Sequence, residues 1–425
     1  MNNFDNIIGY SNEKEELFRI LDALKSSNKY IQLGVKIPKA VLLYGEPGLG
    51  KTLMAKTFIA ESGRKVFHCK KNKSNGEFVK EIKKTFDNAI KDAPSIIFFD
   101  DMDKFAEDNL HHNSNKEEFV AIQTGLEDIV DKDVFVIATA NDIFYLPDSL
   151  MREDRFGKQI EFTAPSFSDS VKIIEHFLKN KHISKEITAE SLAHILFGNS
   201  CAVLESVINE AGIYAAYADR SEITYADIKH SIARVVLKRY ELKDFDDKSK
   251  WRIAYHEAGH AVLHLLSGKT IGSLAIGKCG KDGLGMGICC LSKVGLQSDY
   301  QESEDSVKAW LAGKASVEIQ FGEIDFGATK DLQNAIEEIE NSMEILGANG
   351  FKFLYLRERY CHAQSMKQLD KNQGKKVRLI EEFYNRTKNI LLQNKPFLDV
   401  LAKALYEKEV LLYDEINEIS KGFLH

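Results

Sequence analysis

Residues 45–52 read GEPGLGKT and have the G-x-x-x-x-G-K-[ST] spacing of a phosphate-binding loop. The glycines allow a tight turn whose N–H groups face phosphate oxygens, and the helix expected after the loop adds positive potential. Lys51 offers a positive charge to the terminal phosphates, and the Thr52 hydroxyl is a ligand for Mg²⁺. Because an apolar strand is expected at Ala40–Tyr44, we interpret the segment as an ATP site rather than a plain glycine turn. The predicted contacts are Gly45, Pro47, Gly48, Leu49, Gly50, Lys51, Thr52 and Leu53.

Polar residues that follow two later apolar strands are suited to nucleotide hydrolysis. The strand at 96–99 ends in Asp100, the expected Mg²⁺ partner, and Asp101, the expected water-activating group. A further strand ends at Asn141, which we expect to orient the attacking water or sense the terminal phosphate. Arg152 and Arg155 lie three residues apart, and we expect them to stabilise charge on a neighbouring subunit's nucleotide.

Residues 256–260 read HEAGH within an apolar helical pattern. His256 and His260 are one helical turn apart, so they share a face and can bind one zinc ion. Glu257 lies beside them as a general base for a metal-bound water, whose pKa zinc lowers to about 7. His264 continues the same face, and we interpret it as a core residue.

The third zinc ligand that a catalytic site needs must come from outside this helix. Two downstream acids are candidates: Glu318 in ASVEIQFG and Asp331 in GATKDLQNA. The adjacent Cys289 and Cys290 are a third possibility, but neighbouring strand residues face opposite ways, so we interpret them as packing residues. Spacing alone does not choose among these residues.

The composition restricts the class of protein. The chain has 425 residues, enough for two to four domains, and its net charge is −7, which argues against a nucleic-acid partner. Its six scattered cysteines indicate neither a disulfide scaffold nor a thiolate zinc site. No apolar stretch approaches the roughly 18–20 residues of a membrane span, and the start shows no signal-peptide pattern. We therefore expect a cytoplasmic protein.

The pattern of apolar runs predicts three domains. Strands are expected at 39–44, 66–69, 95–100 and 134–140, and helices at 13–26, 52–62 and 78–91. This alternation favours a parallel sheet covered on both faces in domain 1–165. Helices expected at 169–180, 189–197 and 203–218 form a second domain, 166–240. The charged stretch 238–250 is the expected linker to domain 241–425, with a helix at 251–266, two strands and a turn in 272–287, and mostly helix at 303–419.

These motifs together resemble the FtsH-type AAA+ zinc metalloproteases over nearly the whole chain. The segments that carry the resemblance are FDNIIG at 4–9, KIPKAVLLYGEPGLGKTLMAK, LMREDRFG, AYHEAGHAV and the C-terminal YNRTKNILLQNKPFLDVLAKALYEKEVL. The resemblance implies an α/β AAA+ core with a helical lid, followed by a mostly α-helical zinc peptidase domain. It also implies a homo-hexameric ring in which ATP hydrolysis moves polypeptide substrates to the zinc site.

The resemblance assigns further site residues. GATKDL matches the family's third-ligand motif, which favours Asp331 over Glu318. Arg152 and Arg155 match its intersubunit arginine fingers. The remaining matches are His176 near the ribose and adenine, Ala202 as a small lid residue near the nucleotide, and the Ile8–Gly9 backbone at the adenine edge.

The chain departs from the family pattern in four places. Family members usually carry membrane spans before the AAA+ core, whereas the sequence here starts at the core, so either this is a membrane-free relative or an N-terminal part was removed. Asp101 stands where the family usually has a glutamate, and Val203 where the lid usually has an aspartate. Segment 70–78, with Phe78 its only aromatic, lacks the family's pore loop. The leading hypothesis is an ATP-dependent zinc endopeptidase acting on unfolded or tagged cytosolic proteins. Two alternatives are a nucleotide-gated remodelling ring with structural zinc, and a peptidase that uses ATP binding only for assembly.

Overall fold

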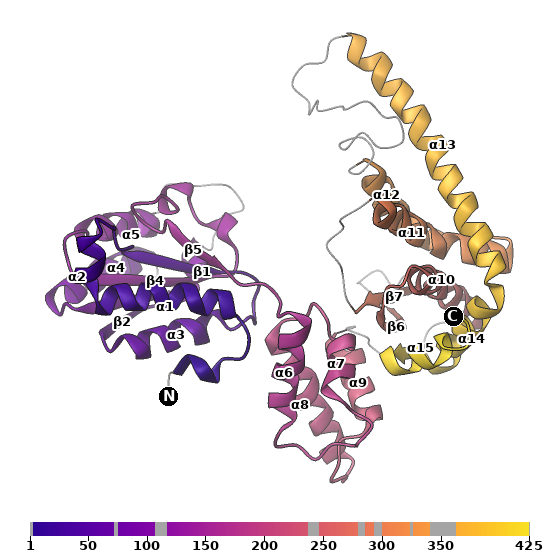
Figure 1. Ribbon diagram of the computed structural model, residues 1–425, viewed down its shortest axis with the longest axis horizontal. Helices are drawn as coiled ribbons and strands as arrows, with labels where there is room; N and C mark the ends of the chain where they lie inside the picture. The colour runs from indigo at the N-terminus through magenta and orange to yellow at the C-terminus, as the bar shows by residue number, and fades with distance from the viewer. Residues whose placement is uncertain are drawn as a thin grey trace. The chain divides into compact units, whose positions relative to one another are not determined.

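The computed structural model describes residues 3–71, 75–106, 117–236, 246–278, 285–292, 300–323, 326–340 and 363–424. The chain forms two compact units, Met1–Ile173 with Gly198–Glu205, and Ile174–Phe197 with Ser206–His425 (Figure 1). The helices of the expected lid are therefore divided between the units, and the boundaries predicted at 165 and 240 stay a prediction.

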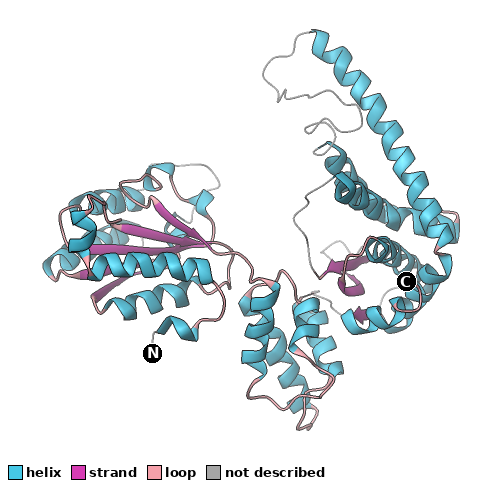
Figure 2. Cartoon of the chain, viewed as in Figure 1, coloured by secondary structure: helices cyan, strands magenta, loops and turns pink. Residues whose placement is uncertain are grey.

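A parallel sheet of five strands lies in the first unit, in the order β2-β3-β4-β1-β5 (Figure 2). Its strands are β1 (Ala40–Tyr44), β2 (Lys65–Cys69), β3 (Ser95–Phe99), β4 (Val134–Ala140) and β5 (Lys158–Glu161). The first four were predicted. β1, β3 and β4 are apolar because central parallel strands covered on both sides are buried, whereas β2 lies at the other edge and is mostly not buried. The edge strand β5 was missed, because its sequence KQIE has a single buried residue.

Helices cover both faces of this sheet. The helices are α1 (Ser11–Lys25), α2 (Ser27–Gln32), α3 (Lys51–Ser62), α4 (Asn75–Lys91) and α5 (Glu117–Asp128). Alternate strand residues pack against α1 and α3 on one face, as Val41 and Leu43 do, and against α4 and α5 on the other, as Leu42 does. Short 3-10 helices lie at η1 (Asn3–Asn6), η2 (Met102–Ala106), η3 (Ile143–Tyr145) and η4 (Asp148–Leu150). This arrangement brings the carboxyl ends of the strands, and the polar residues after them, to one edge.

Helices α6 (Phe167–Leu178), α7 (Ala189–Ile195), α8 (Cys201–Tyr217) and α9 (Tyr225–Val235) follow the sheet. The expected linker at 238–250 needs a correction. Its first part falls outside the described residues, but residues 247–250 form the first turn of α10 (Asp247–Leu266). The side chain of Asp246 accepts from the Ser249 N–H, and this cap starts the helix inside the charged stretch.

The second unit contains the zinc-motif helix α10 and a small antiparallel sheet, β7-β6-β8. Its strands are β6 (Ile271–Lys278), β7 (Gly285–Leu291) and β8 (Val410–Leu412). The helices are α11 (Tyr300–Phe321), α12 (Thr329–Ile339), α13 (Ala363–Gln393), α14 (Lys395–Lys408) and α15 (Tyr413–Ser420), with η5 (Phe326–Ala328) before α12. The predicted fold class, an α/β core with helices followed by a mostly helical domain, is confirmed.

Helices α7 and α9 pack against the end of this helical domain within the second unit. The His194 ring stacks on Tyr413 at 4.1 Å between centroids. Lys229 forms an ion pair of 3.1 Å with Glu415, and both side chains are largely buried.

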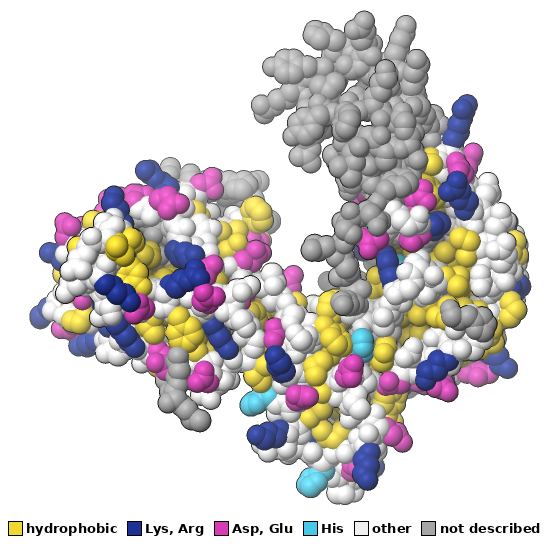
Figure 3. Space-filling view, in the orientation of Figure 1, with side chains coloured by type: hydrophobic (Ala, Val, Ile, Leu, Met, Phe, Trp, Pro, Cys, Tyr) yellow, Lys and Arg dark blue, Asp and Glu magenta, His cyan; other side chains and the backbone are white. Residues whose placement is uncertain are grey.

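On the face that Figure 3 shows, acidic and basic side chains are interspersed.

Candidate nucleotide and zinc sites

The loop between β1 and α3 needs glycine at three positions. Gly45 has φ +136°, and a Cβ there would lie 2.0 Å from the Phe162 carbonyl oxygen. Gly48 has φ +82°, and a Cβ there would lie 2.8 Å from the Ala202 Cβ. Gly50, at φ +90°, is the N-cap of α3. Because L-residues rarely adopt such φ values, the sequence selects one loop conformation at the helix N-terminus.

Lys51 is buried, with 5% of its surface exposed, and its ammonium donates three hydrogen bonds. Nζ donates to the carbonyl oxygens of Gly45 (2.6 Å) and Glu46 (2.7 Å) and to Asn141 Oδ1 (3.1 Å). Burial lowers the pKa of Lys51, while the charges of Asp103 and Asp101 oppose this shift. The lysine therefore links the loop to the carboxyl end of β4.

Asp100 lies at the centre of a hydroxyl network at the same edge. Its Oδ1 accepts from the Thr52 hydroxyl at 3.0 Å and from the Thr139 hydroxyl at 2.9 Å. A hydroxyl and a carboxylate side by side at a phosphate loop are suited to Mg²⁺, which prefers oxygen ligands. The structure thus brings together Lys51, Thr52, Asp100 and Asn141.

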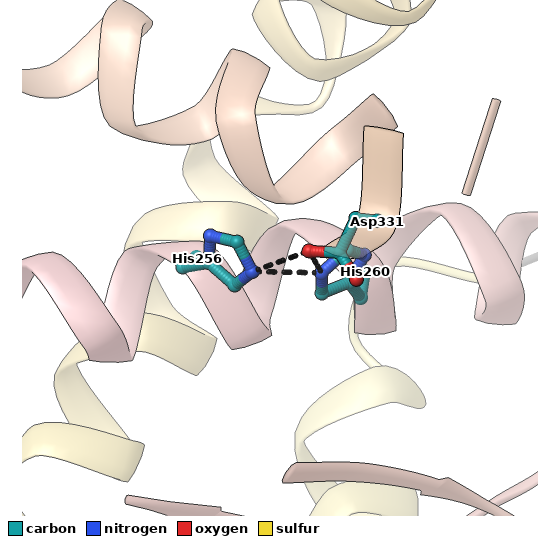
Figure 4. Close-up of side chains that lie close together, drawn as sticks. All are labelled: His256, His260 and Asp331. Carbon is teal, nitrogen blue, oxygen red and sulfur yellow. Dashed lines mark hydrogen bonds and ion pairs between the residues drawn. The ribbon is translucent and has the colours of Figure 1, made fainter. Parts of the chain in front are cut away.

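The second constellation joins helices α10 and α12. His256 Nε2 lies 3.0 Å from His260 Nε2 and 3.1 Å from Asp331 Oδ2, and His260 Nε2 lies 3.4 Å from the same oxygen (Figure 4). One ligand atom from each residue lies within 4.8 Å of the others. Two imidazole nitrogens and a carboxylate oxygen are a donor set that fits zinc with one position left open.

Surrounding contacts fix these ligands. His260 Nδ1 donates to the Ala309 carbonyl oxygen at 2.7 Å, which leaves Nε2 facing the cluster. Burial acts to raise the pKa of Asp331, but its interactions with His256 and His260 outweigh it and hold that pKa well below its ordinary value. Asp331 is therefore ionised, as a metal ligand must be.

Glycines let α10 and α11 approach closely enough to build this cluster. A Cβ on Gly313 would lie 2.6 Å from the Nε2 atoms of both His256 and His260. A Cβ on Gly259 would lie 2.6 Å from the Ala312 carbonyl oxygen. The two imidazoles therefore lie in space that any larger residue at 313 would occupy.

Glu257 lies on the same helix, 5% exposed, with Oε1 4.0 Å from His256 Nε2. A buried carboxylate at this distance is placed to take a proton from a water bound at the open metal position. The cluster and this acid together have the arrangement that a zinc-dependent hydrolytic site requires.

Comparison with known proteins agrees with both constellations. The model for the ATPase family associated with various cellular activities (AAA) matches residues 41–164, and that for peptidase family M41 matches residues 243–419. "ATP-dependent zinc metalloprotease FtsH 4" of Synechocystis is 29% identical over 98% of this chain and 71% of its own length. "ATP-dependent zinc metalloprotease FtsH" of Mycoplasmoides gallisepticum is 30% identical over 98% of this chain and 57% of its own length.

The chain belongs to the FtsH-type zinc metalloproteases. A relative in Helicobacter pylori strain J99, also named FtsH, is 28% identical over 98% of this chain and 70% of its own length. This chain thus spans between 57% and 71% of these three relatives. Family membership implies ATP with Mg²⁺ and Zn²⁺ as cofactors, as predicted. No helix among the described residues is both long enough and apolar enough to cross a membrane.

The other candidate zinc ligands lie in different surroundings. Glu318 forms an ion pair of 2.8 Å with Lys388 and accepts a hydrogen bond from the Tyr384 hydroxyl. Cys289 and Cys290 lie on β7, where burial raises the pKa of both thiols. His264, expected in the core, has its pKa lowered to about 3 by burial. Among the residues that the structure describes, only His256, His260 and Asp331 form a three-ligand group.

Asp101, predicted to activate water, forms ion pairs with two lysines. It has φ +54°, and its Oδ2 lies 3.0 Å from Lys104 Nζ and 4.0 Å from Lys70 Nζ. Lys70 also lies 3.6 Å from Asp100 Oδ2. The lysines that contact this acid pair were not identified from the sequence.

The two predicted arginine fingers differ. Arg155 is 12% exposed, donates to the Ser149 carbonyl oxygen at 2.6 Å and pairs with Glu127 at 2.8 Å. Arg152 is 67% exposed and lies 3.5 Å from Asp154. Arg155 therefore has a structural role within its own chain, while Arg152 is accessible.

The remaining predicted nucleotide contacts are placed as follows. The Ala202 N–H donates to the Gly48 carbonyl oxygen at 3.1 Å, so this lid residue touches the loop. Gly9 has φ +76° and follows the partly buried Ile8. Pro47 and Leu53 are exposed, Leu49 is buried in the core, and His176 is exposed on α6 in the second unit. The roles of these residues stay predictions.

The pore segment at 70–78 is described only in part, because residues 72–74 fall outside the described residues. Its one aromatic, Phe78, is fully buried and packs edge-on against Phe105 at 4.8 Å. Phe78 is therefore a core residue of α4 and not a surface aromatic that could grip a substrate.

Residues that the sequence reasoning missed are Gly313, Ala309, Thr139 and Asp103. The sequence does contain a signal for the first two, because small residues recur on one face of the helix and favour close helix packing. They are Ala309, Ala312, Gly313 and Ser316. Thr139 and Asp103 carry no such pattern, because a polar residue at a strand end or in a turn is common.

Proposed function

We propose that this chain is an ATP-dependent zinc endopeptidase that degrades unfolded or tagged polypeptides in the cytoplasm, as a homo-hexameric ring. The observation that carries the proposal is the group of His256, His260 and Asp331 with buried Glu257 beside it, in a chain that also has a phosphate loop. The membership of the family supports both activities.

The peptidase residues have distinct roles in this proposal. His256, His260 and Asp331 hold zinc, which when bound polarises a water and the scissile carbonyl. Glu257 accepts the proton of the attacking water and delivers it to the leaving amine. The Ala309 carbonyl oxygen holds His260 in the tautomer that leaves Nε2 for the metal.

The nucleotide residues prepare ATP for attack. Lys51 and the loop N–H groups bind the phosphates, while Thr52 and Asp100 hold Mg²⁺. Asn141, at 3.1 Å from Lys51, lies where the terminal phosphate is expected. Arg152, being exposed, is the arginine that we assign to a neighbouring subunit's nucleotide.

The geometry argues against a remodelling ring with structural zinc. Structural zinc sites are closed by four protein ligands, whereas this group has three among the described residues. The alternative in which ATP binding serves only assembly is favoured by one observation, the engagement of Asp101 by Lys104 and Lys70.

The deciding experiment compares purified wild type with Glu257→Gln in casein degradation, with ATP, with a non-hydrolysable analogue and without nucleotide. We expect cleavage only with hydrolysable ATP, and we expect Glu257→Gln to abolish it while ATP turnover and zinc content persist. Exposed Glu205→Gln is the matched control. Cleavage by Glu257→Gln would refute the peptidase assignment, and equal cleavage with the analogue would favour the assembly role.

A further inference from the structure

Tyr10 directly follows the Ile8–Gly9 segment that is expected at the adenine. Its side chain is half-buried and lies against Phe162, with 5.1 Å between the ring centroids. Its hydroxyl oxygen lies 3.2 Å from the Thr163 carbonyl oxygen and 3.6 Å from the Cys201 Sγ. One side chain therefore contacts both the segment that leaves β5 and the first residue of α8.

The groups around this tyrosine determine the direction of each hydrogen bond. A phenol has a single proton, and a carbonyl oxygen can only accept one. The Tyr10 hydroxyl therefore donates to the Thr163 carbonyl oxygen, and the Cys201 thiol donates to the Tyr10 oxygen. Burial raises the pKa of the Cys201 thiol, so the thiol keeps the proton that it donates. The result is a chain of two hydrogen bonds from α8 to the end of β5.

The start of α8 also lies directly on the phosphate loop. The Ala202 N–H donates to the Gly48 carbonyl oxygen at 3.1 Å. A Cβ on Gly48 would lie 2.8 Å from both the Ala202 Cβ and the Ser200 hydroxyl oxygen, so no side chain fits between the loop and the helix. Residues Gly198–Glu205 belong to the same compact unit as the loop. The start of α8 is therefore held twice, by the phosphate loop and by the tyrosine.

The other end of the hydrogen-bond chain reaches the phosphate loop as well. The Phe162 N–H donates to the Tyr44 carbonyl oxygen at 2.7 Å, at the end of β1. The Phe162 carbonyl oxygen lies where a Cβ on Gly45 would come within 2.0 Å of it. Thr163, which accepts from Tyr10, is the next residue along the chain. The tyrosine thus joins three parts of the nucleotide site: the expected adenine segment, the phosphate loop and α8.

We propose that Tyr10 is a positioning residue that retains the nucleotide: its hydroxyl holds the start of α8 against the segment at 8–10, so that ATP and ADP leave slowly. A nucleotide enclosed by these parts leaves when one of them moves, and each hydrogen bond between them opposes that movement. The inference rests on the proposed function, because it takes Ile8, Gly9 and Ala202 as nucleotide contacts.

The test is a double-mutant cycle on the full chain. The release rate of fluorescent ATP and ADP analogues is measured by stopped flow, and their Kd by titration. Tyr10→Phe removes the hydroxyl and keeps the ring, Cys201→Ala removes the thiol, a third variant combines both, and Cys201→Ser keeps a donor. The matched control is Tyr30→Phe, which also loses a hydroxyl hydrogen bond, from α2 to Asp22 on α1.

We expect Tyr10→Phe to raise both the release rate and the Kd about 3- to 10-fold, because a net hydrogen bond contributes a factor of this size to an equilibrium constant. Zinc content should not change. Cys201→Ala should have a smaller effect, because a thiol is a weak donor, and Cys201→Ser should release nucleotide more slowly than Cys201→Ala. The double variant should release it no faster than Tyr10→Phe, because both residues act through one chain of bonds. Tyr30→Phe should match wild type.

Three results would overturn the inference: wild-type release in Tyr10→Phe, effects that multiply in the double variant, or equally fast release from Tyr30→Phe, which indicates a general loss of stability. A wild-type chain that binds no nucleotide would refute the nucleotide part of the proposed function and this inference with it. Nucleotide binding by wild type alongside an unaffected Tyr10→Phe would refute this inference alone.

Discussion

The two sites are built in different ways. The zinc site consists of side chains from packed helices, where Gly313 leaves room for both imidazoles and Gly259 lets α10 lie close to α11. The nucleotide site lies at a sheet edge, where Lys51, Asn141 and Asp100 are joined by hydrogen bonds between loops and strand ends. A site fixed by packing suits a metal with set geometry, while one fixed by exchangeable hydrogen bonds suits a substrate that is bound and released at every turnover.

Enlarging Gly313 should have the largest effect, because it attacks the packing that defines the zinc site. In Gly313→Val, the new side chain displaces both imidazoles, which are held by the cluster and by the Ala309 carbonyl oxygen. We expect loss of bound zinc and a fall of about 100-fold or more in casein cleavage, since second-layer changes alone cost 10- to 100-fold. Metal content by atomic absorption and cleavage rate measure this.

The control for that variant is Gly212→Ala in α8, where an added Cβ meets only Ile223 at an ordinary 3.6 Å. It should keep zinc and activity. Nucleotide binding should survive Gly313→Val, and full zinc occupancy in that variant would show that the site is less tightly packed than the structure indicates.

Removing the Lys51 charge should affect only the nucleotide site. Lys51→Met loses charge-assisted contacts to phosphate, each worth about 1.5–3 kcal/mol, so nucleotide Kd should rise about 10- to 100-fold while zinc content stays constant. Fluorescence titration with an ATP analogue gives the Kd. Lys56→Met, exposed on the same helix, should change neither quantity. A loss of zinc in Lys51→Met would contradict the independence of the two sites.

The sequence predicted those parts of the two sites that local chemistry determines. The phosphate loop and HEAGH are contiguous, so their spacing alone indicates their ligands. Asp331 is brought to the histidines by the packing of α12, so spacing left Glu318 open, and only the family resemblance favoured Asp331, the acid that the structure places beside them. The contacts of Asp101 with Lys104 and Lys70 depend on how the chain turns after β3, which no periodicity encodes.

The sequence did not predict two strands that lie at sheet edges. β5 (Lys158–Glu161) and β8 (Val410–Leu412) are edge or very short strands, with one and three buried residues respectively. Their pairing is determined by the neighbouring strand and not by an apolar run of their own.

Substituting Arg152 and Arg155 in turn compares an exposed arginine with one that is bonded within its own chain. Arg155→Ala leaves Glu127 and the Ser149 carbonyl oxygen without their partner, and we expect a stability loss of about 1–3 kcal/mol. Arg152→Ala should change stability by less than about 0.5 kcal/mol, because its contacts are exposed. The stability of each variant is measured by thermal unfolding, with the release of a bound nucleotide analogue as the signal. If the two variants were equally stable, the contacts of Arg155 would contribute no more to the stability of the fold than those of Arg152.

The smallest expected effect concerns Glu415, on the surface that α9 shares with α15. Burial acts to raise the pKa of Glu415, but bonds from Lys408, the Leu412 N–H and Lys229 hold it below the ordinary 4.5. A carboxyl with a lowered folded-state pKa stabilises the protein above its unfolded pKa, and this contribution is lost as the pH falls through the folded value. Glu415→Gln should therefore cost about 1–2 kcal/mol at pH 7 and progressively less below pH about 4.5.

Urea unfolding followed by tryptophan fluorescence measures this difference, because the chain's two tryptophans, Trp251 and Trp310, both lie in the second unit. The control is Glu418→Gln, whose side chain is 79% exposed and whose pair with Lys421 is weak. A destabilisation by Glu415→Gln that stays constant from pH 7 to pH 3 would mean that the carboxylate charge does not hold α9 to α15. In that case the His194–Tyr413 stack and the apolar contacts would carry the interface alone.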